Sequence, residues 1–263
     1  MVKQGCGLYP FQFVLVTDYV LRRASGFGEK VSGQQLKDLD FTDDVVLLEE
    51  VKQGLQLLLE TISDKAEKVG LIVKVGTSKS MATSSSLLIL KCNIKTIEQV
   101  QEFKYLGSWI EYDGGIVNKI KRRIAQATSV LNKLKPVWRS KKYSLRLKLR
   151  LLNRSVTSIL LYASECWKLN VQLEKRTLAF ENVCLGKILN ISWQDRVTKV
   201  VVRRRTGQPP LTDILKQRRN YLVHVLQMSR DRLLNNVYGW QPKDGRKRGR
   251  PKHTLRRLYD RDL

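Results

Sequence analysis

The chain is poor in the residues that build zinc sites and disulfide frameworks. It has only two histidines, and its four cysteines are far apart with no Cys-x-x-Cys pair. This spacing gives no recognisable zinc motif and favours reduced, buried thiols over disulfides. No apolar run approaches the roughly 18–20 residues of a membrane span, and no signal sequence opens the chain. We therefore expect an intracellular protein, nuclear or cytoplasmic, that is neither secreted nor embedded in a membrane.

Acidic residues are scarce in the second half of the chain. Residues 1–100 contain 12 Lys/Arg and 12 Asp/Glu, whereas residues 101–263 contain 37 and 12. The rear part therefore carries the whole formal net charge of +25. Nucleic acid is the leading partner, because phosphate neutralisation by Lys and Arg supplies most non-specific affinity. A membrane surface is the rival partner, but the basic stretch lacks the adjacent lipidation signal or spanning segment that stable anchoring needs.

Hydrophobic spacing predicts helices and strands in the first part of the chain. A largely buried helix is expected at Phe11–Ala24, entered after Pro10. An amphipathic helix is expected at Glu49–Val69, ended by Gly70. The strand candidates are Leu36–Asp40, Val45–Leu48, Leu71–Val75, Leu87–Lys91 and Phe103–Tyr112.

Beyond the Asp113-Gly114-Gly115 turn the pattern becomes helical and basic. The expected helices are Val117–Leu134, Ser144–Trp167, Leu173–Leu189 and Leu211–Met228. The last 20 or so residues are charged and short of apolar side chains, so a disordered basic tail is expected there. The fold class predicted is α+β, followed by an all-helical region and the tail.

Two adjacent carboxylates, Asp43 and Asp44, stand at the turn of the predicted hairpin. Each carboxylate raises the pKa of the other, a penalty that a divalent cation removes. Hard cations such as Mg²⁺ take one or two carboxylates together with phosphate oxygens. A solvated turn is the alternative interpretation of the same pair.

The flanking segments resemble the reverse transcriptases of non-LTR, LINE-type retrotransposons, most closely the RTE-like elements. Phe41-Thr42-Asp43-Asp44 looks like the Phe/Tyr-Ala-Asp-Asp catalytic turn of that family. The matching segments, in family order and covering nearly the whole chain, are Lys3–Pro10, Phe41–Asp44, Gly70–Met81, Phe103–Gly107, Ser158–Trp167, Arg205–Pro209, Leu222–Met228 and Arg248–Pro251.

The resemblance implies roles for individual residues. Asp43 and Asp44 would hold Mg²⁺ in an incomplete site, and Lys79 would lie close to the phosphates as a third catalytic group. The expected nucleotide and template contacts are Gly5, Cys6 and Pro10. The strand that grips the primer end would be formed by Phe103, Tyr105, Leu106 and Gly107.

The resemblance also implies a domain plan and partners. It predicts an incomplete palm sheet with helices at residues 1–112, thumb-like helices at 113–170, a C-terminal helical region at 171–240 and the basic tail at 241–263. The partners would be an RNA template and a DNA primer or target. A deoxynucleoside triphosphate would be the one small-molecule substrate of the intact enzyme.

Such polymerases use three carboxylates, and the first lies on a palm strand before the segment that opens here at Gly5. We therefore expect this chain to be a fragment that does not polymerise alone, since a metal ligand is worth several decades in rate. Tyr9 and Gln12 depart from the family pattern. A non-catalytic nucleic-acid-binding protein and a translated, non-functional remnant of an element are the alternatives.

Basic clusters are the candidate nucleic-acid contacts. Each is equally compatible with a solvated helix face or tail. Arg248-Gly249-Arg250-Pro251 also resembles an AT-hook core, although a nuclear-import patch has the same composition. The candidate residues are Lys119, Arg122, Arg123, Arg139, Lys141, Lys142, Arg203, Arg204, Arg205, Arg248 and Arg250.

Overall fold

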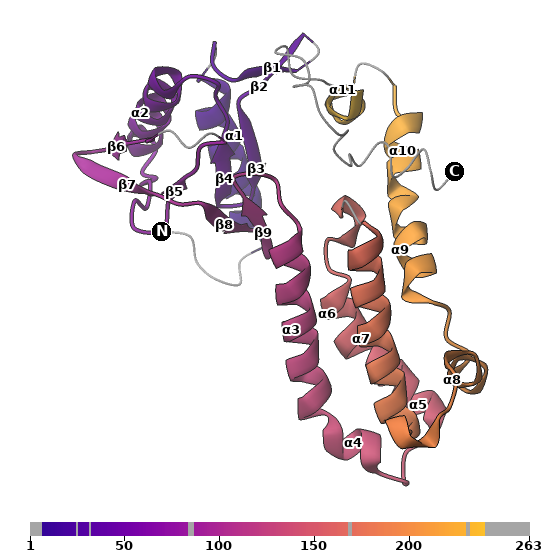
Figure 1. The fold of residues 1–263 in the computed structure, drawn as a ribbon. Coiled ribbons are helices and arrows are strands. Elements are labelled where there is room, and N and C mark those ends of the chain that lie inside the picture. Colours follow the sequence, from indigo (N-terminus) through magenta and orange to yellow (C-terminus); the bar gives the residue numbers. More distant parts are fainter. Residues whose placement is uncertain are drawn as a thin grey trace. The chain divides into compact units, whose positions relative to one another are not determined.

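A computed structural model describes residues 7–24, 26–31, 33–83, 87–167, 170–229 and 232–239. It divides into two compact units (Figure 1). The N-terminal unit contains the described residues up to Gly114 together with α11 (Leu233–Gly239), which contacts β1 (Glu29–Val31). The helical unit is Gly115–Ser229. Small sheets with helices in one unit and helices in the other confirm the α+β fold class.

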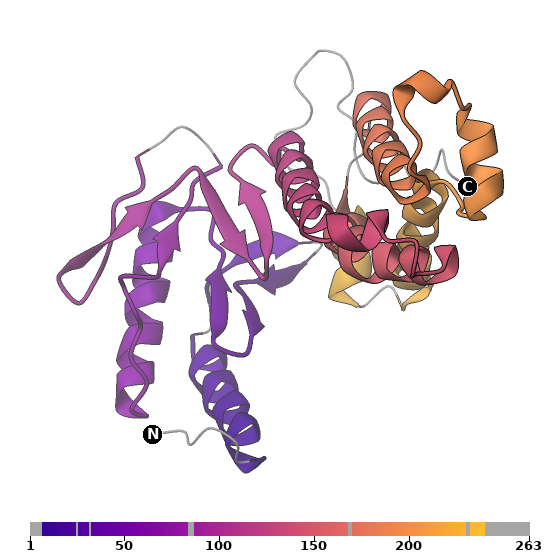
Figure 2. The ribbon, with the colours of Figure 1, turned by 90° about the horizontal axis from the view of Figure 1, so that it is seen from below.

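Two helices lie side by side in the N-terminal unit, α1 (Leu8–Arg22) and α2 (Lys52–Lys68) (Figure 2). They form a small core in which Val20 and Leu21 pack with Leu58 and Ile62. Helix α2 confirms the helix expected at Glu49–Val69. Gly70 ends it as predicted, since its φ of +78° allows its own N–H and that of the next residue to bond the carbonyls of the last turn.

Helix α1 differs from its prediction in two ways. It begins at Leu8, so Pro10 lies inside the first turn and not before the helix. The expectation of a largely buried helix is wrong, because Phe11 and Leu15 are 62% and 52% exposed. This segment is apolar nearly all round, and α2 covers only one of its faces.

Among the described residues of the N-terminal unit, the strands form four small sheets. Each of these contains one antiparallel hairpin, and β5 adds in parallel to β7. The turns of β3–β4, β6–β7 and β8–β9 are each two residues long. The bounds are β1 as above, β2 (Gln34–Leu36), β3 (Asp38–Phe41), β4 (Asp44–Leu47), β5 (Lys79–Ser80), β6 (Leu90–Cys92), β7 (Lys95–Gln99), β8 (Glu102–Tyr105) and β9 (Ser108–Glu111).

Two strand predictions fail in this unit. Residues 71–75 form no strand, and the single strand expected at Phe103–Tyr112 is the β8–β9 hairpin. Its turn, Leu106-Gly107, has positive φ at both residues, as the tight turns that match strand twist require. Glycine adopts that conformation without strain, and the turn interrupts what the sequence shows as one apolar stretch.

Most of the buried apolar residues described in the helical unit form a single hydrophobic cluster. Ile120, Trp138, Val156, Leu185 and Leu215 all belong to it, so residues on both sides of the predicted boundary at 170 share one core. The bounds of its helices are α3 (Val117–Lys133), α4 (Lys135–Arg139), α5 (Leu145–Leu151), a π segment (Leu152–Thr157), α6 (Ser158–Leu160), α7 (Val171–Leu189), α8 (Lys199–Thr206), α9 (Leu211–Arg219) and α10 (Tyr221–Gln227).

Helices α3 and α7 match their predictions within two residues. The helix expected at Ser144–Trp167 is divided by the π segment and ends at Leu160, and the one expected at Leu211–Met228 is interrupted at Asn220. Trp138 and Trp167 are 1% and 0% exposed, which places both in the core. Within the described residues, no helix combines the length and hydropathy that crossing a membrane requires.

Candidate functional site

The paired aspartates lie at the tip of the β3–β4 hairpin. Thr42 and Asp43 form its turn, and Phe41 faces Asp44 across the strands. Thr42 has a φ of +55°, a conformation that costs a β-branched residue on the order of 1–3 kcal/mol. Its Oγ1 lies 2.7 Å from the Phe41 carbonyl oxygen and 3.0 Å from Asp43 Oδ1, and its one proton serves one of them at a time. Strained turns of this kind cluster at functional sites.

Tyr105 connects a second hairpin to these carboxylates. It is the last residue of β8, directly before the Leu106-Gly107 turn. Partial burial raises the pKa of its phenol, and the negative charges of Asp44 and Asp40 raise it further. The effect of a charge weakens with distance, so the Tyr105 phenol lies within electrostatic range of the aspartate hairpin. Phe103 and Gly107 are half-buried in the same hairpin, and Leu106 is exposed at 36%.

Lys37 attaches the aspartate hairpin to helix α1. Its Nζ donates hydrogen bonds to the carbonyl oxygens of Leu21 and Ala24, the latter at 2.9 Å, where α1 ends. A cation at a helix C-terminus satisfies carbonyls that lack a partner within the helix. The next residue, Asp38, has its pKa raised by burial, against the lowering effect of Lys37. Sequence reasoning missed Lys37, because a lone lysine before a strand carries no distinguishing pattern.

The aspartate hairpin fits a hard cation in part. Asp40, Asp43 and Asp44 are exposed, so carboxylate oxygens face solvent. Mg²⁺ needs no more than one or two carboxylates when water and phosphate oxygens complete its shell. Among the described residues, no group of three or more His, Cys, Asp and Glu side chains is placed to hold a metal ion. The donor set therefore suits one cation shared with a phosphate group; a two-metal centre needs a further ligand.

Lys79 lies in a different part of the N-terminal unit. It is on β5 and forms an ion pair with Glu98 of β7. The two line a pocket of about 660 Å³ with Lys74 and Lys95. Its ion-pair partner among the described residues is Glu98, and no described interaction connects it to Asp43 or Asp44.

The predicted contacts on α3 are only partly exposed. Lys119, Arg122 and Arg123 are all half-buried. The guanidinium of Arg123 lies 4.5 Å from the centre of the Tyr162 ring, a cation–π contact, and burial lowers the pKa of this arginine. Arg123 therefore packs against Tyr162 within the helical unit.

Arg203 has a structural partner. Its guanidinium nitrogen lies 2.7 Å from Glu181 Oε2 in an ion pair whose acidic member is 7% exposed. Arg204 and Arg205 on the same helix are exposed, as are Arg139, Lys141 and Lys142 around the connection between α4 and α5. The exposed cations are the ones free to meet phosphate groups.

Four predicted residues lie outside the described residues: Gly5, Cys6, Arg248 and Arg250. Pro10 is exposed in the first turn of α1. The described cysteines Cys92, Cys166 and Cys184 are free thiols, of which Cys92 and Cys184 are buried and Cys166 is exposed.

Comparison with known proteins points to mobile elements. The chain is 24% identical over 223 residues to an uncharacterized transposon-derived protein of Caenorhabditis elegans, covering 81% of this chain and 80% of that protein. It is 34% identical over 119 residues to the retrovirus-related Pol polyprotein of the type-2 retrotransposable element R2DM of Drosophila melanogaster. It is 31% identical over 133 residues to the Pol polyprotein of a type-1 element R2 of Nasonia vitripennis. No protein-family model matches the chain.

The chain is related to retrotransposon proteins. The two Pol polyproteins are matched over 40% and 45% of this chain, but these matches span only 11% and 13% of the polyproteins. The matches are to R2 elements and to a transposon-derived protein, so they support the retrotransposon relation without singling out the RTE-like lineage.

Proposed function

We propose that the chain is a palm-and-thumb fragment of a non-LTR retrotransposon reverse transcriptase. The N-terminal unit holds a metal-binding hairpin, the helical unit binds template and primer, and polymerisation requires a further carboxylate from another segment. The observation that carries the proposal is the electrostatic effect of Asp44 and Asp40 on Tyr105, whose phenol pKa they raise together with burial. This supports the proposal because Asp44 belongs to the turn that resembles the family's catalytic hairpin, and Tyr105 to the segment that resembles its primer grip. The RTE-like assignment rests on motif order alone.

In this proposal, Asp43 and Asp44 hold Mg²⁺ against phosphate oxygens, and the cation supplies charge stabilisation where phosphoryl transfer occurs. Tyr105 and the Leu106-Gly107 turn position the end of the primer beside the carboxylates. Lys37 holds the hairpin against α1 through the carbonyl groups at the end of that helix. The partners are an RNA template and a DNA primer.

The metal site can be tested with Mn²⁺ as a paramagnetic probe. In the full chain bound to a primed RNA template, Mn²⁺ should broaden the NMR signals of residues 40–46 most strongly. Asp43→Asn with Asp44→Asn should abolish that broadening. Asp64→Asn, an exposed aspartate on α2, should leave it intact. Equal broadening in the Asp43/Asp44 variant would overturn the metal assignment.

Binding of nucleic acid is tested separately. Fluorescence anisotropy should show affinity for a primed RNA template that falls steeply with salt, because counterions are released from each contacted phosphate. Absence of binding at low salt would refute the whole proposal. Extension of the primer by the full chain alone, in Mg²⁺, would refute the requirement for a further carboxylate.

A non-catalytic nucleic-acid-binding protein is the second candidate. The observation that favours it is the set of exposed cations Arg139, Lys141, Lys142, Arg204 and Arg205, whose exposure does not depend on any metal site. Retained template binding with no Mn²⁺ effect at residues 40–46 would support this candidate.

A further inference from the structure

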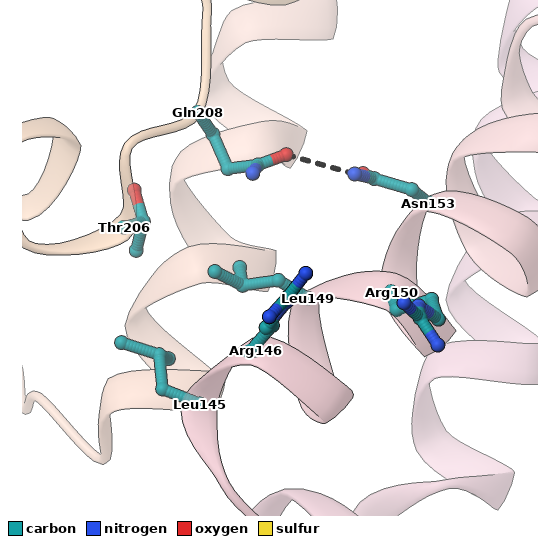
Figure 3. Close-up of a pocket in the computed structure, with 7 residues that line it drawn as sticks. All are labelled: Leu145, Arg146, Leu149, Arg150, Asn153, Thr206 and Gln208. Carbon is teal, nitrogen blue, oxygen red and sulfur yellow. Dashed lines mark hydrogen bonds between the residues drawn. The ribbon is translucent and has the colours of Figure 1, made fainter.

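The helical unit contains a pocket of about 370 Å³ that none of the predicted contact residues lines. Its walls come from α5, from the first turn of the π segment, and from the end of α8 with the turn that follows it. Figure 3 shows Asn153 and Gln208 directed toward one another at one side, with Arg146 and Arg150 on α5. The volume lies within the range of small-ligand pockets, about 300–1,000 Å³.

The pocket is basic, and none of the described residues that line it is acidic. Arg146 and Arg150 are one helical turn apart and share a face of α5. Both are exposed, and neither forms an ion pair with any described residue. Leu145 and Leu149 lie on the same helix and give the pocket an apolar wall. Two guanidinium groups without an ion-pair partner in the described part of the chain, beside an apolar wall, suit a ligand that is part anion and part ring or sugar.

An amide pair fixes the opposite side. Asn153 Nδ2 donates a hydrogen bond to Gln208 Oε1 at 2.9 Å, which leaves the amide N–H groups of Gln208 available to a ligand. Asn153 stands where the helix widens, since its carbonyl oxygen accepts from the N–H of Ser158, five residues on. Such π turns are rare and occur often at functional sites.

Gly207 directs Gln208 into this pair. It follows α8 with a φ of +62°, and its N–H bonds the Arg203 carbonyl at 2.8 Å. A left-handed residue at a helix end reverses the chain direction, and glycine takes that conformation without strain. The Arg205–Pro209 segment thus gains a physical role: it ends α8 and places Gln208 opposite Asn153.

We propose that this pocket binds one phosphate group of a nucleic-acid strand. Arg146 and Arg150 bind the phosphate oxygens, Gln208 donates to them through its free amide hydrogens, and Leu145 and Leu149 contact the attached sugar or base. The partner is nucleic acid because the half of the chain that contains the pocket carries the whole net charge of +25. The inference rests on the proposed binding of template and primer by the helical unit.

Binding of a 12-nucleotide RNA to the full chain, measured by anisotropy, tests the proposal. The double variant Arg146→Gln, Arg150→Gln should lose about tenfold in affinity, and its salt dependence should fall by about one phosphate contact. The control Lys175→Gln, Arg176→Gln removes the same charge from exposed positions on α7 and should change the affinity by less than about threefold. Equal losses of RNA affinity in the two double variants would contradict phosphate binding at this pocket.

A second variant tests the same pocket while keeping both arginines, in case the double arginine variant folds poorly. Asn153→Asp keeps the size of the side chain, but its carboxylate can only accept, so it pairs with Gln208 when the Gln208 amide turns over and donates an N–H. The same carboxylate repels a phosphate group. It should weaken RNA binding about as much as the arginine variant does. The thermal midpoints of both variants should stay near that of the original chain. Unchanged affinity in a folded Asn153→Asp variant would contradict the assignment.

Titrations with different ligands distinguish a nucleic-acid strand from a free nucleotide or inorganic phosphate as the source of the phosphate group. NMR signals of the Arg146 and Arg150 Nε atoms should shift on adding the 12-nucleotide RNA at concentrations at which inorganic phosphate and nucleoside monophosphates have no effect. Equal shifts with a nucleoside monophosphate would replace the strand by a free nucleotide. If the original chain fails to bind RNA, the proposed function is refuted. If the original chain and the pocket variants bind RNA with equal affinity, only this inference is refuted.

Discussion

Tyr105 and Asp44 lie on different hairpins, yet the Asp44 carboxylate contributes to the raised pKa of the Tyr105 phenol. Sheet hydrogen bonding does not connect the two hairpins, because β3–β4 and β8–β9 are separate two-stranded sheets among the described residues. Tertiary structure, and not strand pairing, therefore places the Tyr105 phenol within range of the Asp44 charge.

This relationship can be measured directly. Asp44→Asn should lower the pKa of Tyr105 toward its ordinary value, because a negative charge that opposes the phenolate is removed. Burial persists in the variant, so the pKa should remain above about 10. A pH titration of ¹³Cζ-labelled tyrosine, assigned with Tyr105→Phe, gives the value. Asp64→Asn is the control and should leave the Tyr105 pKa unchanged. An unchanged Tyr105 pKa in Asp44→Asn would show that the Asp44 charge does not act on the phenol.

The turn between β6 and β7 should be improved by glycine. Ile94 has a φ of +71° and is 98% exposed, so a β-branched residue adopts a left-handed conformation with no packing in return. Ile94→Gly should stabilise the N-terminal unit by about 1 kcal/mol, the left-handed penalty less the entropy of the unfolded glycine. Urea denaturation measures the change. Ile94→Ala keeps the unfavourable φ and should gain little stability. An equal gain in stability from alanine would show that backbone strain at this position is not the cause.

Arg203 should matter more for stability than its neighbours on α8. Its partner Glu181 is nearly buried and loses its compensating charge in Arg203→Ala. Breaking a buried pair costs about 3–5 kcal/mol, and the partial exposure of Arg203 reduces the expected loss to about 2 kcal/mol. Arg204→Ala and Arg205→Ala should each change stability by less than about 0.5 kcal/mol. Thermal denaturation compares the three, and indistinguishable midpoints would count against a structural role.

Alkaline pH should weaken the helical unit through Cys184. Burial raises the pKa of this thiol to about 12. Because the folded pKa lies above the unfolded value of about 8.5, the contribution to stability is full below that pH and is lost as the pH rises toward the folded value. Cys184→Ala should lower stability at pH 7, since it leaves a cavity, but show a shallower decline above pH 8.5. Parallel pH profiles for the two proteins would contradict this.

Local patterns predicted the elements whose signals lie within a few neighbouring residues. The spacing of Leu58, Ile62 and Ala66 along α2, with Gly70 after it, defines a helix and its end through interactions of one turn's range. The Thr42-Asp43 turn is likewise set by residues adjacent in sequence. The exposed face of α1 was not predictable, because an apolar segment does not specify how many neighbours will cover it.

The sequence by itself determined the α+β class, the aspartate pair at a hairpin tip and the concentration of positive charge after residue 100, since each depends on residue types and short spacings. The tertiary structure alone decided which charges are engaged and which are free. Glu181 holds Arg203, Glu98 holds Lys79, and Asn153 meets Gln208 beside two arginines without ion-pair partners among the described residues. These pairs join residues far apart in the chain, and only folding determines which of them meet.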